Sequence, residues 1–283
     1  MRLDDEQESQ NIEDRRGFRV SKGVAGGGIG GIAIILIALF LGVDPSALLQ
    51  SNSQVSVEPE PAADSQRAGR DEGREFVARV LGSTERTWGE IFQRAGHTYT
   101  QPKLVLFSGQ VQSACGFAQA AAGPFYCGND QKVYLDLSFF RELHERFQAP
   151  GDFAQAYVIA HEVGHHVQNS LGIMEKIQAR QSRAGEREAN ALSVRLELQA
   201  DCLAGIWASF ANRERKILEP GDVEEGLNAA AQIGDDVIQK RAQGYVVPEG
   251  FTHGSAEQRV TWFRRGIQSG DLKQCDTFAR GVS

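Results

Sequence analysis

The chain has 283 residues, which is enough for one sizeable hydrophobic core or two small ones. Its hydrophobic content of 41% and charged content of 24% are ordinary for a globular protein. The net charge of −7, with no basic block beyond the N-terminus, argues against a nucleic-acid-binding surface, so we expect no nucleic-acid partner.

A polar tail and an apolar segment open the chain. Residues 1–22 are polar and charged and are predicted to form a disordered cytoplasmic tail. Residues 23–43 contain no charge, and as a helix their length roughly matches a bilayer core of about 30 Å. Five basic residues precede the segment and none follows it before Arg67. The positive-inside rule therefore predicts a single-pass inner-membrane protein with a cytoplasmic N-terminus and the remaining chain outside.

Other interpretations of residues 23–43 are a cleaved signal peptide and a buried core helix. We favour a retained anchor in the lipid bilayer because residues 42–47 match an A-x-A-type cleavage site poorly. Gly23, Gly27 and Gly31 recur every four residues and could pair two such helices in a homodimer. They could equally be tolerated small residues, which is the interpretation we favour.

The rest of the chain is predicted to contain a linker over 44–71 and one folded domain over 72–283. Apolar spacing predicts helices over 75–95 (broken near Gly82), 137–147, 152–171, 190–210 and 222–244, with a last one from Ser255. Residues 173–189 read as an exposed helix or a mobile connection. Strands are predicted over 103–107 and 131–136, with a short edge strand over 125–127. These elements predict a mostly helical α+β fold with a small sheet ahead of helix 152–171.

Four cysteines, all beyond the apolar segment, fit an oxidising compartment. Cys115 and Cys127 are close in sequence and flank a glycine-rich turn, so we pair them, which leaves Cys202 with Cys275. A free, buried Cys202 is the alternative.

The helix predicted over 152–171 contains His161-Glu162-x-x-His165. In a helix the two histidines leave the same face, so both imidazoles can bind one zinc ion at about 2.0–2.1 Å. Glu162 then lies beside the open coordination position. The spacing predicts a zinc hydrolase, although so short a motif can also occur by chance.

A catalytic zinc ion needs a third protein ligand, and the next histidine after His166 is His253. Glu197 and Asp201 lie four residues apart, on one face of a predicted helix in an otherwise apolar stretch. Acids in such a place need partners, which a metal ion and its histidines would supply. The alternative is a pair of acids on a solvated face.

Together these motifs resemble the gluzincin pattern of zinc peptidases. More closely, the chain is similar to the bacterial family of membrane-anchored neutral zinc metallopeptidases, through residues 13–17, 113–116, 123–127, 133–140, 197–202 and 251–255. The resemblance implies a zincin-like domain preceded by one transmembrane helix. It also implies Glu197 as the third ligand of one zinc ion, and Asp201 as the acceptor for the far nitrogen of His161.

The predicted activity is that of an endopeptidase acting on peptides or proteins outside the cytoplasmic membrane. Glu162 would be the general base, and His253, in a glycine-rich loop, is the candidate to stabilise the oxyanion. A loop histidine with a structural bond is the alternative for His253. We interpret His166 as a surface or second-layer residue, and the strand over 125–127 as the edge that pairs with substrate.

Two other functions fit the same residues. One is a non-catalytic zinc-binding interaction or assembly module, although a structural site has no need of Glu162. The other is a zinc amidase acting on cell-wall peptides, which the ligand set permits. The residues do not exclude another divalent ion, because ligand preferences overlap.

Overall fold

The computed structural model describes residues 1–17 and 71–279. The predicted transmembrane segment over 23–43 and nearly all of the predicted linker lie outside these residues. Within the described ranges, no helix is both long and apolar enough to cross a membrane.

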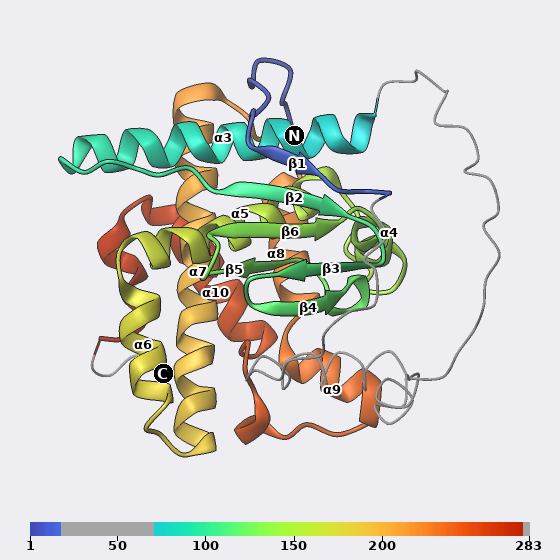
Figure 1. Ribbon diagram of the computed structural model, residues 1–283, viewed down its shortest axis with the longest axis vertical. Helices are drawn as coiled ribbons and strands as arrows, with labels where there is room; N and C mark the ends of the chain where they lie inside the picture. The colour runs from blue at the N-terminus through green and yellow to red at the C-terminus, as the bar shows by residue number, and fades with distance from the viewer. Residues whose placement is uncertain (18–70, 280–283) are drawn as a thin grey trace.

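The described chain is mostly helical with a small sheet, as predicted (Figure 1). Its strands are β1 (Ile12–Asp14), β2 (Lys103–Phe107), β3 (Gln110–Ser113), β4 (Gly116–Gln119), β5 (Phe125–Cys127) and β6 (Lys132–Asp136). Its α-helices are α3 (Glu72–Arg94), α4 (Ser138–Glu145), α5 (Asp152–Ser170), α6 (Ile173–Gln181), α7 (Glu186–Arg215), α8 (Asp222–Gln232), α9 (Asp235–Gln243) and α10 (Ala256–Ser269).

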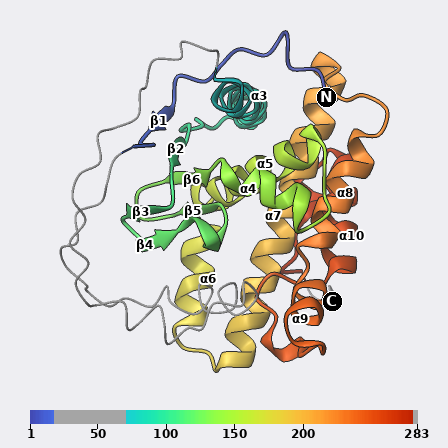
Figure 2. The ribbon, with the colours of Figure 1, turned by 90° about the vertical axis from the view of Figure 1, so that its right-hand side faces the viewer.

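Helix α5 lies at the centre of the fold. The sheet lies on one side of it, and α7, α8 and α10 lie on the other (Figure 2). Its apolar residues are almost completely buried, among them Phe153, Tyr157 and Val163. Because α5 contacts both layers, its polar side chains lie between the sheet and the helical layer.

The main sheet has the order β1-β2-β6-β5. Strands β1, β2 and β6 are parallel, and β5 pairs antiparallel with β6. Strand β5 therefore forms an edge of the sheet next to α5, as the sequence predicted. Strands β3 and β4 form a separate hairpin, which the sequence did not predict.

Two helix crossings leave little or no room for a side chain at the contact. A Cβ atom at Gly164 of α5 would lie 3.0 Å from the carbonyl oxygen of Ala200 on α7. A Cβ at Gly266 of α10 would lie 2.0 Å from the carbonyl oxygen of Cys202, also on α7. These glycines let α5 and α10 both approach α7 closely, at the place where side chains of all three helices meet.

Both predicted disulfides are confirmed: Cys115 bonds to Cys127, and Cys202 bonds to Cys275. The first joins the turn between β3 and β4 to the edge strand β5. The second joins α7 to the short 3₁₀ turn Leu272–Cys275 that follows α10.

Several predicted boundaries were wrong. Helix α3 runs through Gly82 without a break, and α7 begins before Asn190 and extends past Phe210. The single helix predicted over 222–244 is two helices, because Gly234 has an extended backbone and a Cβ there would lie 2.4 Å from the Ala256 nitrogen.

The N-terminal tail predicted to be disordered over 1–22 is ordered in its described part, residues 1–17. Residues 1–17 pack on the domain, and β1 forms one edge of its sheet. The prediction of a disordered tail is therefore wrong for residues 1–17, because backbone hydrogen bonds and the packing of Met1, Leu3 and Ile12 on the hydrophobic core hold them in place.

Candidate metal and catalytic centre

Helix α5 places His161 and His165 on one face, as their spacing predicts. Both rings lie at the wall of a cavity and are nearly buried, with side-chain exposures of 8% and 12%. Their ring centroids are 4.8 Å apart. The two imidazoles are thus close enough for one ion to contact both.

Helix α7 brings Glu197 to the same point. Its carboxylate oxygens lie 3.1 Å from His161 Nε2 and 3.4 Å from His165 Nε2. One donor atom from each of these three residues lies within 4.8 Å of the other two. The three residues therefore form a group that could hold a metal ion, in the combination that the sequence predicted.

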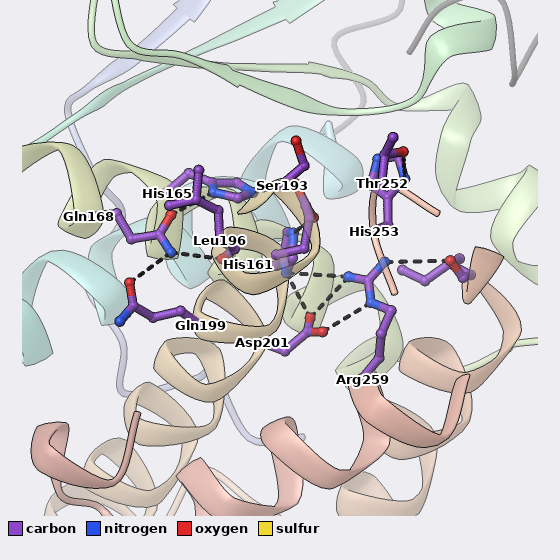
Figure 3. A network of polar contacts seen from close by, with 12 residues as sticks. His161, His165, Gln168, Ser193, Leu196, Gln199, Asp201, Thr252, His253 and Arg259 are labelled. Carbon is purple, nitrogen blue, oxygen red and sulfur yellow. Dashed lines mark hydrogen bonds and ion pairs between the residues drawn. The ribbon is translucent and has the colours of Figure 1, made fainter. Parts of the chain in front are cut away.

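Hydrogen bonds to the far side of each ring determine which nitrogen faces the carboxylate. His161 Nδ1 lies 2.8 Å from Asp201 Oδ1, and a carboxylate can only accept there (Figure 3). His165 Nδ1 lies 2.8 Å from Gln168 Oε1. The amide orientation of Gln168 is fixed because its NH₂ group donates to the Leu196 carbonyl at 2.7 Å.

In the neutral form, the one that can bind a metal ion, each ring therefore carries its proton on Nδ1 and presents a lone pair from Nε2 toward Glu197. Two lone pairs and a carboxylate directed at one point repel one another unless a cation lies between them. This donor set of two nitrogens and one carboxylate suits zinc, so the residues fit the ion.

The pKa shifts of His161 and Glu197 also indicate that positive charge is favoured between these residues. Burial alone lowers the pKa of His161, but Asp201 and Glu197 outweigh it and raise that pKa to about 10. Burial alone raises the pKa of Glu197, but His165 and His161 lower it well below its usual value. The carboxylate is thus held in its charged form at the point where the two rings converge.

Asp201 is a fully buried carboxylate with three side-chain partners, of which Figure 3 labels His161 and Arg259. Besides His161, it accepts hydrogen bonds from Tyr157 Oη at 2.6 Å and from Arg259 Nε and Nη2 at 3.0 Å each. Burial alone raises the pKa of Asp201, but the charges of Arg259 and His161 lower it. Asp201 thus stays ionised and fixes the orientation of His161, as predicted, while Arg259 and Tyr157 are partners that the sequence did not reveal.

Glu162 is nearly buried, at 8% exposure, and lines the same cavity as the histidines. Burial raises its pKa above the usual value for a glutamate, an effect that the charges of His161 and His165 reduce. A carboxylate with a raised pKa beside the donor group is suited to accept and return a proton.

His253 also lines the cavity, from the loop before α10. Asp235 fixes that loop, since its Oδ2 accepts hydrogen bonds from the backbone of Thr252 at 2.8 Å, His253 at 2.6 Å and Gly254 at 2.9 Å. Its Oδ1 lies 3.2 Å from His253 Nδ1. Burial lowers the pKa of His253, but Asp235 and Glu197 raise it above the usual value. The sequence predicted His253 and missed Asp235.

His166, which we interpreted as a surface or second-layer residue, is 1% exposed. Its Nδ1 lies 3.0 Å from Tyr126 Oη in β5, and its Nε2 lies 2.6 Å from the Thr100 carbonyl oxygen. A surface position is therefore excluded. This histidine instead joins the edge strand β5 to the helix that carries the donor group.

The cavity around these residues has a volume of about 380 Å³. The edge strand contributes Phe125 and Tyr126 to its wall. A larger cavity of about 800 Å³ lies between α7 and α10 and contains none of the groups described above. We assign the site to the smaller cavity because only there do the donor group and Glu162 meet.

A second group of acids, Asp152, Asp222 and Glu225, lies near the start of α5. The amino group of Met1 lies 2.7 Å from Asp152 and 3.4 Å from Asp222, and so supplies a positive charge to this group. This amino group already occupies part of the space between the acids and offsets part of their charge.

Two histidines on one helix, a carboxylate on a second and an adjacent glutamate in a cavity are typical of metal-dependent hydrolases. The chain matches, over residues 1–278, the family described as "Putative neutral zinc metallopeptidase", and it belongs to that family. The resemblance found in the sequence is thereby confirmed, and membership implies zinc as the metal.

Relatives of the chain are found in Escherichia coli and in Mycobacterium tuberculosis. "Uncharacterized protein YpfJ" of Escherichia coli (strain K12) is 45% identical over 299 aligned positions that cover 100% of both chains. "Uncharacterized protein Rv2575" of Mycobacterium tuberculosis (strain ATCC 25618 / H37Rv) is 41% identical over 258 positions, which cover 86% of this chain and 85% of the relative. No solved structure matches the chain.

Proposed function

We propose that this protein is a zinc-dependent endopeptidase in which His161, His165 and Glu197 hold one zinc ion. One observation carries the proposal: the two Nε2 lone pairs and the Glu197 carboxylate converge on one point beside Glu162. A non-catalytic zinc module would have no use for a buried glutamate at that position.

The proposed mechanism assigns a step to each group in the cavity. Zinc, when bound, lowers the pKa of water and polarises the substrate carbonyl. Glu162 accepts a proton from the attacking water and returns it to the leaving amine, for which its raised pKa is suited. His253, held in position by Asp235, which also raises its pKa, donates a hydrogen bond to the oxyanion.

The edge strand β5 is the proposed binding surface for an extended peptide. It is antiparallel to β6, has no further strand on its other side among the described residues, and contributes to the cavity wall. A peptide could therefore add to the sheet at β5 and lie across the donor group. The disulfide from Cys115 to Cys127 ties this strand to the β3–β4 turn, and the bond from Tyr126 to His166 holds it against α5.

We also propose that the enzyme acts outside the cytoplasmic membrane and is attached to the bilayer through residues 23–43. The two disulfides support this location, because such bonds persist in oxidising compartments. The proposed partner is a peptide or protein substrate. Residues 23–31 lie outside the described residues, so homodimer pairing through their glycines, the less favoured interpretation, stays a prediction.

The test uses the full-length protein, loaded with zinc, beside a Glu162→Gln variant. We expect both proteins to bind one zinc ion, and the variant to cleave a diverse peptide library about 10²–10⁴-fold more slowly. If both bind one zinc ion and neither cleaves any peptide, the peptidase proposal fails. Cleavage restricted to cell-wall peptides would favour the amidase alternative.

A further inference from the structure

Backbone hydrogen bonds fasten residues 1–17 to the domain along most of their length. Near the start, Arg2 N donates to the Ile217 carbonyl at 2.8 Å, just beyond α7. In the middle, Ser9 N donates to the Ala78 carbonyl of α3 at 2.9 Å. At the end, β1 pairs with β2 in parallel register. The segment thus contacts three separate parts of the domain.

Buried side chains reinforce this contact. Glu6 has a side-chain exposure of 2% and lies 2.6 Å from Arg215 Nε at the end of α7. Ser9 and Asn11 both donate hydrogen bonds to Glu85 of α3, at 2.7 Å each. Glu6 and Glu85 are buried acids, so each would lose its partners if the segment left the domain.

A glycine in α3 leaves room for the backbone of the N-terminal segment. Gly82 lies in the middle of α3, where glycine weakens a helix. A Cβ atom at this position would lie 2.1 Å from the Gln7 carbonyl oxygen. The glycine that the sequence suggested as a helix break is therefore the place where the N-terminal segment touches the helix backbone.

Arg16 and Asp71, which lie at the borders of the two described ranges, are held together by an ion pair. Arg16 Nη2 lies 2.6 Å from Asp71 Oδ2 and also contacts Asp14. A single passage through a bilayer core would separate these two residues by about 30 Å or more. A docked N-terminal segment and a single membrane crossing between residues 17 and 71 therefore exclude each other.

We propose that residues 1–17 stay docked on the catalytic domain in the full-length protein, and that both therefore lie on the same side of the membrane. This inference replaces the cytoplasmic N-terminus that the positive-inside rule predicts. It does not depend on the proposed peptidase activity.

Docking is tested by two glycine substitutions in α3 of the full-length protein in isolated membranes. A Cβ at Gly89 would meet nothing within 4 Å, so Gly89→Ala should preserve or raise the thermal midpoint. Gly82→Ala should lower the midpoint by about 2–4 °C or more, because it collides with Gln7. If Gly82→Ala is as stable as Gly89→Ala, the segment is not docked and the proposal is wrong.

The side of the membrane is tested with a thiol reagent that does not cross it. All four native cysteines are in disulfides, so one added cysteine gives the signal. The two sites are Asp4→Cys in the segment and Glu188→Cys on the domain, whose native side chains are 95% and 61% exposed. We expect both variants to react equally in intact spheroplasts.

If Asp4→Cys reacts only after permeabilisation while Glu188→Cys reacts before it, the inference is overturned. If both react only after permeabilisation, the shared side is supported, and the extracytoplasmic location under the proposed function is contradicted instead. The two proposals can therefore fail separately.

Discussion

At the residue scale, Asp201 accepts hydrogen bonds from His161, Tyr157 and Arg259. Asp201→Asn would remove the charge that holds His161 Nδ1 and leave Arg259 buried without a counter-ion. We expect zinc affinity to fall about 10–100-fold, measured by competition with a chelator. We also expect the free energy of unfolding to fall by about 3–5 kcal/mol.

The matched control is Asp222→Asn. Asp222 is also a buried acid, but it lies in the separate acidic group near Met1. Its substitution should affect stability and leave zinc affinity unchanged. Wild-type zinc affinity in Asp201→Asn would show that this carboxylate does not orient the ligand.

Single residues differ in how far sequence predicts them. The motif of His161, Glu162 and His165 follows from helical spacing, whereas the apolar stretch only marked Glu197 and Asp201 as candidates and the family resemblance implied their roles. Arg259 lies 58 residues beyond Asp201, and no local pattern links the two. Tyr157 belongs to the apolar stripe of its helix, which does not reveal the partner of its hydroxyl group.

At the element scale, the site depends on how closely α5 and α7 approach. Gly164 is the residue at this contact, and a Cβ there would lie 3.0 Å from the Ala200 oxygen and 3.2 Å from its Cα. Gly164→Ala should therefore push α7 outward and move Glu197 away from the histidines. We expect weaker zinc binding and a loss of about 1–3 kcal/mol in stability, measured by zinc titration and denaturant unfolding.

Gly89→Ala is the control here too, because that position is open. It should alter neither zinc binding nor turnover. If Gly164→Ala binds zinc as tightly as the wild type, the helix contact does not set the position of Glu197.

Helices and strands with strong local patterns were predicted well, and their ends were not. Helix α10 begins next to Ser255, where a start was predicted, and Ser255 caps it in a capping box with Gln258. The break at Gly234 and the unbroken helix at Gly82 depend on what packs against each glycine. That information is tertiary and is absent from the local sequence.

At the scale of the whole molecule, sequence predicted the α+β class, the small sheet and both disulfides. It missed the participation of residues 1–17, because their polar composition resembles a disordered segment. Strand β1 pairs with a strand about 90 residues away, and no periodicity within so short a strand can indicate a distant partner. Hydrogen bonds, buried charges and a few apolar side chains, among them Leu3 and Ile12, attach residues 1–17 to the domain.

The central claim is that Glu197 completes a catalytic zinc site with the two histidines of α5. The most direct test is zinc content after exhaustive dialysis, measured together with peptide turnover, in the full-length Glu197→Gln variant. Because the amide removes the negative charge and one acceptor oxygen from the donor group, we predict loss of both zinc and turnover. Retention of one zinc ion and of wild-type turnover by Glu197→Gln would contradict the account.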